Sequence, residues 1–505
     1  MSGLELLGSP PLSFRGLFAG ASARLQALLR AARVLVASRG LKATDLLNAW
    51  DQERESMLGF SVLVEDPGLD DRASPTAAAG PRLGVASLPN QKTLQTPCLL
   101  VYAGKGCSPN VTWDALQLIG ERINALDPES SGSPVAYQLD VLQMIHQQAN
   151  IRGFLSTSAA LSQPVPSARA FLGVPQGNVL VATPRNPTAY EHMGMTRLST
   201  DQRASCMTSK GAAFTTPEDY MEMACGVGAD IVVALGDEVL SDARLNRVVE
   251  SSKRTIQWMQ RALLWLVERN QLPFLVCPIV GGGTLEKRRD ALEYTMMHVK
   301  DPRVHGVYVS GLGTGDSVSQ RQEILREVVA RVPRDKLRMV SGISNPLEIL
   351  EAVRCGVDVF DTAFVDLATR AGLALCFPTD AAGGADLRAP GDSSNLASHT
   401  DIDAAYAFDH AGFDGMKINL WSDAYKLDRS PLVDDCLCAS CQEHTRGYVH
   451  HLLVTHEMTG NVLLEQHNIF HMLRFFAGIR RAIRNGRFEQ YREALVDHVQ
   501  RWQRG

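Results

Sequence analysis

The chain has 505 residues, of which 45% are hydrophobic and 21% are charged, and its formal net charge is −5. This composition predicts a globular protein with one large domain and an appendage, or with two to three domains. No apolar run approaches the roughly 20 residues that a membrane span requires. The slightly acidic balance does not indicate nucleic-acid binding, so any such role needs a local basic patch.

The first 60 residues are predicted to form an N-terminal extension that stands apart from the rest. Its basic residues are opposed by a single acid, Glu5, before Asp45, and alanine, serine and leucine fill the gaps. An acid-poor, arginine-bearing amphipathic terminus is typical of an organelle transit peptide. A surface helix over residues 21–37 is the alternative. Residues 66–81, rich in proline, glycine and alanine, then predict a linker or loop.

Between residues 82 and 377, short apolar runs alternate with helical patterns. Several runs are rich in Val, Ile and Leu without strict alternation, as in strands buried on both faces. Strand-then-helix repetition over this length predicts a parallel α/β fold, and the number of strands suits a TIM-like (β/α)8 barrel. The expected strands are 84–88, 98–102, 178–182, 230–235, 274–280, 306–310, 338–341 and 357–360. The expected helices include 216–226, 245–270, 285–298, 318–331 and 346–355.

Glycine or acidic residues follow several of these strands, where a barrel places its functional loops. Gly281–Gly283 and Gly311–Gly313 let a backbone approach a planar ligand, or they simply form tight turns. Asp237 and Glu238 could bind the N–H groups of a base, although such acids more often cap or begin a helix. Asp361 could act as a carboxylate nucleophile at a sugar carbon. Taken alone, it is better explained as a strand-end cap.

Three cysteines lie close together in the stretch Cys436-Leu-Cys438-Ala-Ser-Cys441. This spacing cannot lie along one face of a helix or strand, but it suits a tight turn that directs three sulfurs at one centre. Tetrahedral Zn²⁺ takes such ligands together with a fourth from elsewhere, and His467 can supply it, with His471 as the rival. The other cysteines occur singly and no secretory signal is evident, which favours metal over disulfides. The sequence therefore predicts one structural Zn²⁺.

The rest of the C-terminal region has three further features. Residues 378–403 are polar and glycine-rich, and they predict a flexible insertion before a zinc-binding subdomain at 404–505. An apolar stripe at 470, 473, 476 and 479 predicts a core face rather than a subunit interface. The arginines near the end could contact phosphates, or they could belong to a solvated helix face. They are Arg474, Arg480, Arg481, Arg484, Arg487, Arg492, Arg501 and Arg504.

The zinc stretch, followed by Thr445-Arg-Gly-Tyr-Val-His-His-Leu-Leu-Val454 and His467-Asn468, resembles the C-terminal signature of the queuine/archaeosine tRNA-ribosyltransferase family. Other segments agree with the family in order, and the resemblance covers roughly residues 82–500. Among these segments are 96–102, 279–283, 310–313 and 356–361. The resemblance implies a (β/α)8 barrel with an inserted zinc-binding subdomain. It also implies exchange of guanine for queuine at wobble position 34 of tRNAs with GUN anticodons.

The sequence departs from the catalytic members of that family at several places. Their Asp-Ser-Gly-Gly-Phe-Gln loop, which carries a proton-handling aspartate, is missing from the corresponding region, roughly 155–185. The glutamine before their paired glycines is Gly281 here, and the acid after the fourth strand is displaced to Asp237. Asp361 occupies the nucleophile position, but the Pro-Thr-Arg-x-x-Arg tail is replaced by Val365-Asp-Leu-Ala-Thr-Arg370. Losing base-recognition and proton-handling groups removes the contacts that make exchange fast.

We therefore expect a non-catalytic subunit that forms a heterodimer with a catalytic queuine tRNA-ribosyltransferase subunit and helps to hold tRNA. Asp361 would then be vestigial, and the only cofactor would be one Zn²⁺ per subunit on Cys436, Cys438, Cys441 and His467. The alternative is a self-sufficient tRNA-guanine transglycosylase that uses Asp361 as its nucleophile. A homodimer is the alternative assembly. The expected location is the cytoplasm, with association with mitochondria as a second hypothesis.

Overall fold

The fold is that of a computed structural model, which describes residues 58–65, 80–130, 134–160, 168–184, 199–208, 210–343, 345–361, 363–379 and 415–504. Contacts divide the chain into Met1–Met57 and Leu58–Gly505, and everything below concerns the second unit. The predicted helix at 21–37 lies outside the described residues. So do nearly all of the predicted linker at 66–81 and of the insertion at 378–403.

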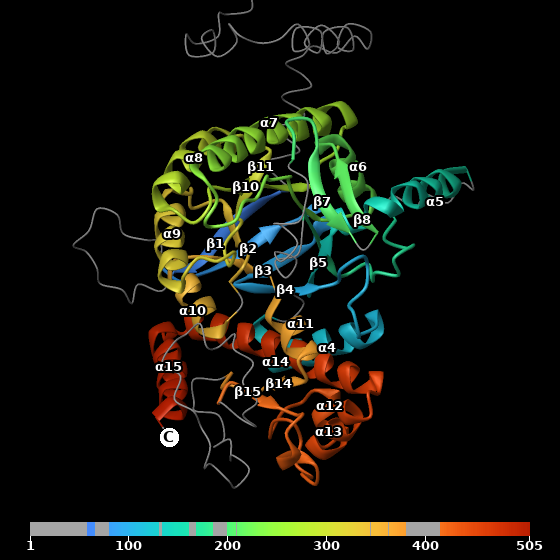
Figure 1. The fold of residues 1–505 in the computed structure, drawn as a ribbon, viewed down its shortest axis with the longest axis vertical. Coiled ribbons are helices and arrows are strands. Elements are labelled where there is room, and N and C mark those ends of the chain that lie inside the picture. The colour runs from blue at the N-terminus through green and yellow to red at the C-terminus, as the bar shows by residue number, and fades with distance from the viewer. Residues whose placement is uncertain are drawn as a thin grey trace, which may run out of the picture. The chain divides into compact units, whose positions relative to one another are not determined.

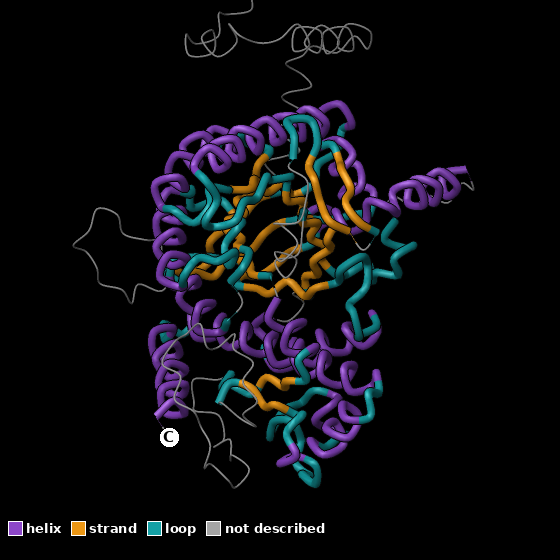
Figure 2. Tube along the Cα trace, in the orientation of Figure 1, coloured by secondary structure: helices purple, strands orange, loops and turns teal. Residues whose placement is uncertain are grey.

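Eight parallel strands close into a barrel, which confirms the predicted fold class (Figures 1 and 2). Among the barrel strands, the sequence prediction missed β5 (Ala136–Asp140), and one predicted strand does not belong to the barrel. The stretch 84–88 belongs instead to β2 (Arg82–Ser87), in an antiparallel sheet with β1 (Gly59–Glu65) and β3 (Thr93–Thr96). The barrel strands, in order around the ring, are β4 (Cys98–Tyr102), β5 (Ala136–Asp140), β6 (Val179–Thr183), β9 (Ile231–Val233), β10 (Phe274–Ile279), β11 (Val304–Val309), β12 (Leu337–Val340) and β13 (Val359–Phe360).

Apolar side chains from the strands fill the barrel interior. Alternate residues such as Leu100, Val181, Val276 and Met339 form one buried cluster. Side chains of the antiparallel sheet, including Phe60, belong to the same cluster, so this sheet closes one end of the barrel. The opposite end, where the strands finish, carries the polar and glycine residues, and we call it the barrel mouth.

Helices surround the barrel, as the purple ring around the orange strands in Figure 2 shows. Their starts follow ordinary capping chemistry. Thr216 and Asn345 cap helices that begin with proline, and Ser317 and Gln320 form a capping box. The predicted helices agree with the observed ones to within about two residues at either end. The helices are α4 (Trp113–Leu126), α5 (Gln148–Ala160), α6 (Pro217–Gly226), α7 (Leu245–Arg269), α8 (Leu285–Val299), α9 (Val318–Arg331), α10 (Pro346–Arg354) and α11 (Ala363–Arg370).

The C-terminal region is built around one long buried helix, α14 (Met458–Arg484). It packs against α11, α4 and β4, and the ring centroids of Phe360 in β13 and Phe476 in α14 are 5.5 Å apart. Helix α14 therefore covers the seam between the last and first barrel strands, β13 and β4. Three residues of the predicted stripe, Phe470, Phe476 and Ile479, are buried, and the fourth, Leu473, is half-buried and packs against the same core, which confirms the predicted core face.

The remaining C-terminal elements precede or follow α14. They are an antiparallel pair of strands, β14 (Leu373–Leu375) and β15 (Lys417–Asn419), and helices α12 (Ala439–Glu443), α13 (Arg446–Val454) and α15 (Phe488–Arg504). Another antiparallel pair, β7 (Ala204–Thr208) with β8 (Gly211–Thr215), precedes α6. Within the described part of the chain, no helix combines the length and apolar character needed to cross a membrane.

Candidate metal centre and barrel mouth

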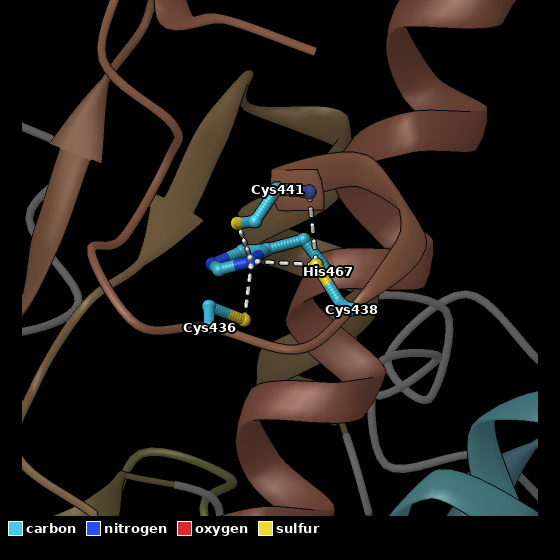
Figure 3. Close-up of side chains that lie close together, drawn as sticks. All are labelled: Cys436, Cys438, Cys441 and His467. Carbon is cyan, nitrogen blue, oxygen red and sulfur yellow. Dashed lines mark hydrogen bonds between the residues drawn. The ribbon is translucent and has the colours of Figure 1, made fainter. Parts of the chain in front are cut away.

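The cysteine stretch and α14 bring four buried side chains together (Figure 3). Cys438 caps the N-terminus of α12, and its Sγ accepts a hydrogen bond from the Cys441 backbone amide at 3.3 Å. The Ser440 hydroxyl donates to the Leu463 carbonyl at 2.7 Å, which fixes α12 against α14. His467 projects from α14 toward the three sulfurs. The local turn therefore does what its spacing predicted, and the tertiary fold supplies the histidine.

The geometry of this Cys3His group fits a small tetrahedral cation. The four ligand atoms lie within 4.8 Å of one another. His467 Nδ1 lies 3.8, 3.5 and 3.3 Å from the Sγ atoms of Cys436, Cys438 and Cys441. Ideal Zn²⁺ bond lengths of about 2.3 Å to sulfur and about 2.0 Å to nitrogen would place such atoms about 3.5 Å apart in a tetrahedron. The buried group could thus bind a metal ion with little rearrangement.

A hydrogen bond determines which nitrogen of the His467 ring carries the proton. The second ring nitrogen of His467, Nε2, lies 2.8 Å from the Leu375 carbonyl, which requires it to carry the proton. Nδ1 is then left as an acceptor, as a metal ligand must be. The rival His471 is not part of the group: its Nε2 lies 2.9 Å from the Phe377 carbonyl, and burial lowers the pKa of its ring to about 3. His471 is a neutral core residue.

Packing three thiols together perturbs their acidity. Hydrogen bonds from Cys438 and Cys441 hold the pKa of the Cys436 thiol far below its usual value. The hydrogen bond to Cys436 raises the pKa of Cys438, and the same partner raises that of Cys441 to about 12. Ionisation of Cys436 is thus favoured, whereas further ionisation of Cys438 or Cys441 beside it is opposed. A divalent cation at the centre would favour the thiolate form of every one of them.

At the barrel mouth, Asp361 follows β13 and is almost completely buried, with 1% of its surface exposed. Burial raises the pKa of Asp361 to about 8, and the charge of Glu238 adds to this, whereas the Ser341 side chain and the Gly342 amide oppose it. Asp361 is therefore mostly protonated at neutral pH, which weakens it as a nucleophile.

The second acid of the mouth, Asp237, is neutralised by arginines from α7. Arg247 donates to both carboxylate oxygens at 2.7 and 2.8 Å, and Arg254 donates to one at 2.5 Å. Asp237 is 2% exposed, and its backbone amide donates to the Thr255 hydroxyl. Neither sequence hypothesis for Asp237 describes this arrangement, because it neither caps a helix nor offers a free carboxylate to a base.

A buried arginine, Arg288, binds the backbone of the two loops that contain Gly281–Gly283 and Gly311–Gly313. The Arg288 guanidinium donates to the carbonyls of Ile279, Gly282, Ser310 and Gly311 at 2.7 to 3.2 Å. Gly281 has φ +148°, and an added Cβ would lie 3.0 Å from the Cα and Cδ of Arg288. A glutamine at position 281 would therefore be strained, so the loops are closed turns around Arg288 rather than an open cradle for a planar ligand.

Sequence reasoning missed these three arginines. A signal existed for two of them, since Arg247, Arg254 and Arg261 recur every seven residues along α7 and thus share one face of that helix. Arg288 gave no comparable signal, because it lies beside Arg289, which is exposed and pairs with Glu327. Only the fold separates the two neighbours.

Several C-terminal arginines have intramolecular partners. Arg480 donates to the Pro97 carbonyl at 3.0 Å, and Arg481 donates to the Leu126 carbonyl at 3.2 Å. Arg484 pairs with Glu129 at 2.9 Å, and Arg492 pairs with Glu351 at 3.0 Å. These four side chains hold α14 and α15 to the barrel, a role that neither sequence alternative had included.

The fold and the buried group define a TIM-like barrel protein whose C-terminal region carries a Cys3His group that could bind a metal ion. A family profile described as queuine tRNA-ribosyltransferase matches residues 77–501. The chain therefore belongs to the queuine tRNA-ribosyltransferase family, as the resemblance in the sequence predicted.

Similar proteins refine this assignment. The chain is 29% identical over 432 residues to the queuine tRNA-ribosyltransferase accessory subunit 2 of Gallus gallus, covering 83% of this chain and 95% of the relative. It is 27% identical over 413 residues to the protein of the same name from Homo sapiens, covering 80% and 92%. A Helicobacter pylori protein named queuine tRNA-ribosyltransferase is 28% identical over 284 residues, covering 56% of this chain and 66% of the relative.

Proposed function

We propose that this chain is the non-catalytic subunit of a heterodimeric queuine tRNA-ribosyltransferase. In that role it supports exchange of guanine for queuine at wobble position 34 of tRNAs with GUN anticodons, a step in queuosine modification. The observation that carries the proposal is the similarity, over most of both chains, to proteins named accessory subunit 2. Their name implies a catalytic partner, and we propose that the heterodimer, rather than this chain alone, engages tRNA.

The chemistry of the barrel mouth supports a non-catalytic role. Nucleophilic attack on a ribose carbon needs an ionised carboxylate, and burial keeps a proton on Asp361 up to a pH of about 8. Recognition of a base needs acceptors that are free to bind it, and Asp237 is already paired with Arg247 and Arg254. At position 281, a glutamine would be strained by the backbone conformation and by its close approach to Arg288.

The runner-up function is a self-sufficient transglycosylase that uses Asp361. One observation favours it: the carboxylate lies at the carboxyl end of a barrel strand, the place where barrel enzymes carry catalytic groups. The electrostatics of that carboxylate and the named relatives weigh against it.

We further propose that the metal is Zn²⁺, one per subunit, and that its role is structural. Four protein ligands, Cys436, Cys438, Cys441 and His467, leave no open coordination position for a substrate or water. We propose a cytoplasmic location, with association with mitochondria as the alternative, and a heterodimer as the working assembly, with a homodimer as the alternative.

The assembly can be tested by native mass spectrometry of the purified chain, alone and mixed with a catalytic family member. A one-to-one complex that retains a GUN-anticodon tRNA more tightly than either subunit alone is the expected result. Absence of any complex at micromolar concentrations would contradict the proposed role.

A further inference from the structure

A buried carboxylate ties the metal-bearing helix to the barrel mouth. Glu465 lies on α14, two residues before His467, and is almost completely buried. Its two carboxylate oxygens accept hydrogen bonds from the Ser108 hydroxyl and the Asn110 side-chain amide. These donors lie in the loop between β4 and α4, 357 and 355 residues earlier in the chain. The contact therefore joins the first barrel unit to the Cys3His group.

The loop that Glu465 holds has one defined shape and forms part of the mouth. Gly106 has φ +117°, and an added Cβ there would lie 2.5 Å from Leu172, so only glycine fits. The Gly104 carbonyl accepts a hydrogen bond from the Asp140 amide at 2.9 Å, and the Ala103 amide donates to the Gln138 carbonyl at 2.9 Å. Both partners lie in β5. The position of this loop therefore affects the edge of the mouth beside β5.

Stability alone is a poor explanation for the Glu465 contact. Its two donors are neutral groups, and a buried carboxylate incurs a desolvation cost that neutral donors offset only in part. Apolar residues of similar volume at such sites are often neutral or stabilising. A carboxylate that holds two donors, however, fixes the direction of both, as a positioning residue must.

We propose that Glu465 is a positioning residue that couples the Cys3His group to the loop 103–110 at the barrel mouth. Within a helix, residues two positions apart move together, because they lie only about 3 Å apart along its axis. Ligation of a metal by His467 thus fixes Glu465, and Glu465 fixes Ser108 and Asn110. Coupling is reciprocal, so loosening the loop weakens metal retention. This inference holds whichever subunit performs the chemistry.

The test measures metal retention in variants that do not touch the metal. The full chain, loaded with Zn²⁺, would be mixed with a colorimetric chelator, and the rate of zinc transfer would be recorded. The variants are Ser108→Ala with Asn110→Ala, Glu465→Ala and Glu465→Gln. Gln466→Ala controls for a change on α14, and Ser317→Ala controls for a lost serine at another loop of the barrel. Hydrogen exchange of amides 103–112 would be followed in the same samples.

The loop double variant and Glu465→Ala are expected to release zinc about 5- to 10-fold faster, a coupling of ordinary size. Their 103–112 amides should exchange faster, and Glu465→Gln, which keeps one acceptor oxygen, should be partly rescued. Both controls should match the wild type. If the loop double variant releases zinc at the wild-type rate while its 103–112 amides exchange faster, the loop and the metal are uncoupled and the proposal is wrong. If Ser317→Ala has the same effect, the cause is general destabilisation, and the proposal is again wrong.

Discussion

An acid in a catalytic position acts as a nucleophile only if its surroundings keep it ionised. Asp361 lies at the carboxyl end of a barrel strand, but burial raises its pKa to about 8. Asp237 shows the opposite case, since Arg247 and Arg254 bind its carboxylate and thereby remove it from recognition. At the residue scale, the surroundings of Asp361 oppose its ionisation, and the arginine partners of Asp237 occupy its carboxylate.

Asp361 should also make the stability of the protein depend on pH. Its pKa of about 8 in the folded state lies above the value of about 3.9 expected in the unfolded chain. The carboxyl therefore stabilises the folded state most below pH 4, and this contribution is lost as pH rises to about 8. Asp361→Asn should remove this slope and raise the unfolding temperature at pH 8 by about 1–3 °C. Differential scanning fluorimetry from pH 6 to pH 9 measures both. A lower unfolding temperature at pH 8 would contradict this account of Asp361.

The metal ligands allow a paired prediction. Cys438→Ser should lose the metal and much of its solubility together, because ligation energy is folding energy in such sites. His471→Gln should keep the metal, since His471 donates to the Phe377 carbonyl and is not part of the Cys3His group. Metal content by atomic emission, together with the soluble yield, distinguishes the two. A well-folded, metal-free Cys438→Ser protein would show that the site is not structural.

A site residue can be predicted from the sequence when its partners lie close to it along the chain. Cys436, Cys438 and Cys441 were predictable because one short turn brings their sulfurs together. The state of Asp237 was not predictable from the residue itself, because its two arginines come from the following helix. The state of Asp361 depends on burial within a closed barrel, which no local pattern encodes.

At the element scale, α14 combines functions that usually belong to separate helices. It covers the seam between β13 and β4, carries His467, and holds β14 through Asn468. The Asn468 side chain donates from its Nδ2 to the Leu373 carbonyl at 2.9 Å. Its Oδ1 accepts from the Leu375 backbone amide at 2.9 Å. His467 binds the Leu375 carbonyl next to these contacts. Helix α14 therefore fixes the strand that precedes the metal-binding subdomain.

Replacing Asn468 tests this role. Asn468→Ala would leave the Leu373 carbonyl and the Leu375 amide buried without their partner, at a cost of about 1–3 kcal/mol for each group. We expect a clear drop in unfolding temperature with the metal still bound. Ser440→Ala removes a single hydrogen bond to α14 at the Leu463 carbonyl and should cost less. If Asn468→Ala unfolds at the wild-type temperature, α14 does not hold β14 in the way described.

Barrel strands with strong apolar character were predictable from the sequence, and the more polar strand β5 was not. Strands such as β10 are buried along their whole length and stood out as apolar runs. Strand β5 was missed because it reads Ala-Tyr-Gln-Leu-Asp, although every residue in it is buried. Gln138 is satisfied inside the barrel by Thr183, at 3.0 Å, and the Tyr137 ring lies 4.9 Å from that of Trp113. These compensating contacts come from other elements and leave no trace in the local pattern.

At the scale of the whole molecule, the chain combines a closed barrel, a buried Cys3His group and a mouth whose acids are buried or paired. The family profile spans residues 77–501, so the framework is that of the family throughout. Within this framework, burial raises the pKa of Asp361, Arg247 binds Asp237, and an added Cβ at Gly281 would lie 3.0 Å from Arg288. A fold can thus persist as a binding framework after its pocket has lost the chemistry.

The most direct test of this account is base exchange into a tRNA with a GUN anticodon. Incorporation of labelled base would be measured for this chain alone, for its mixture with a catalytic family member, and for that mixture with Asp361→Ala in this chain. We predict no exchange by the chain alone, exchange by the mixture, and no effect of Asp361→Ala on the mixture. Exchange by the chain alone that disappears with Asp361→Ala would contradict the account and identify this chain as the enzyme.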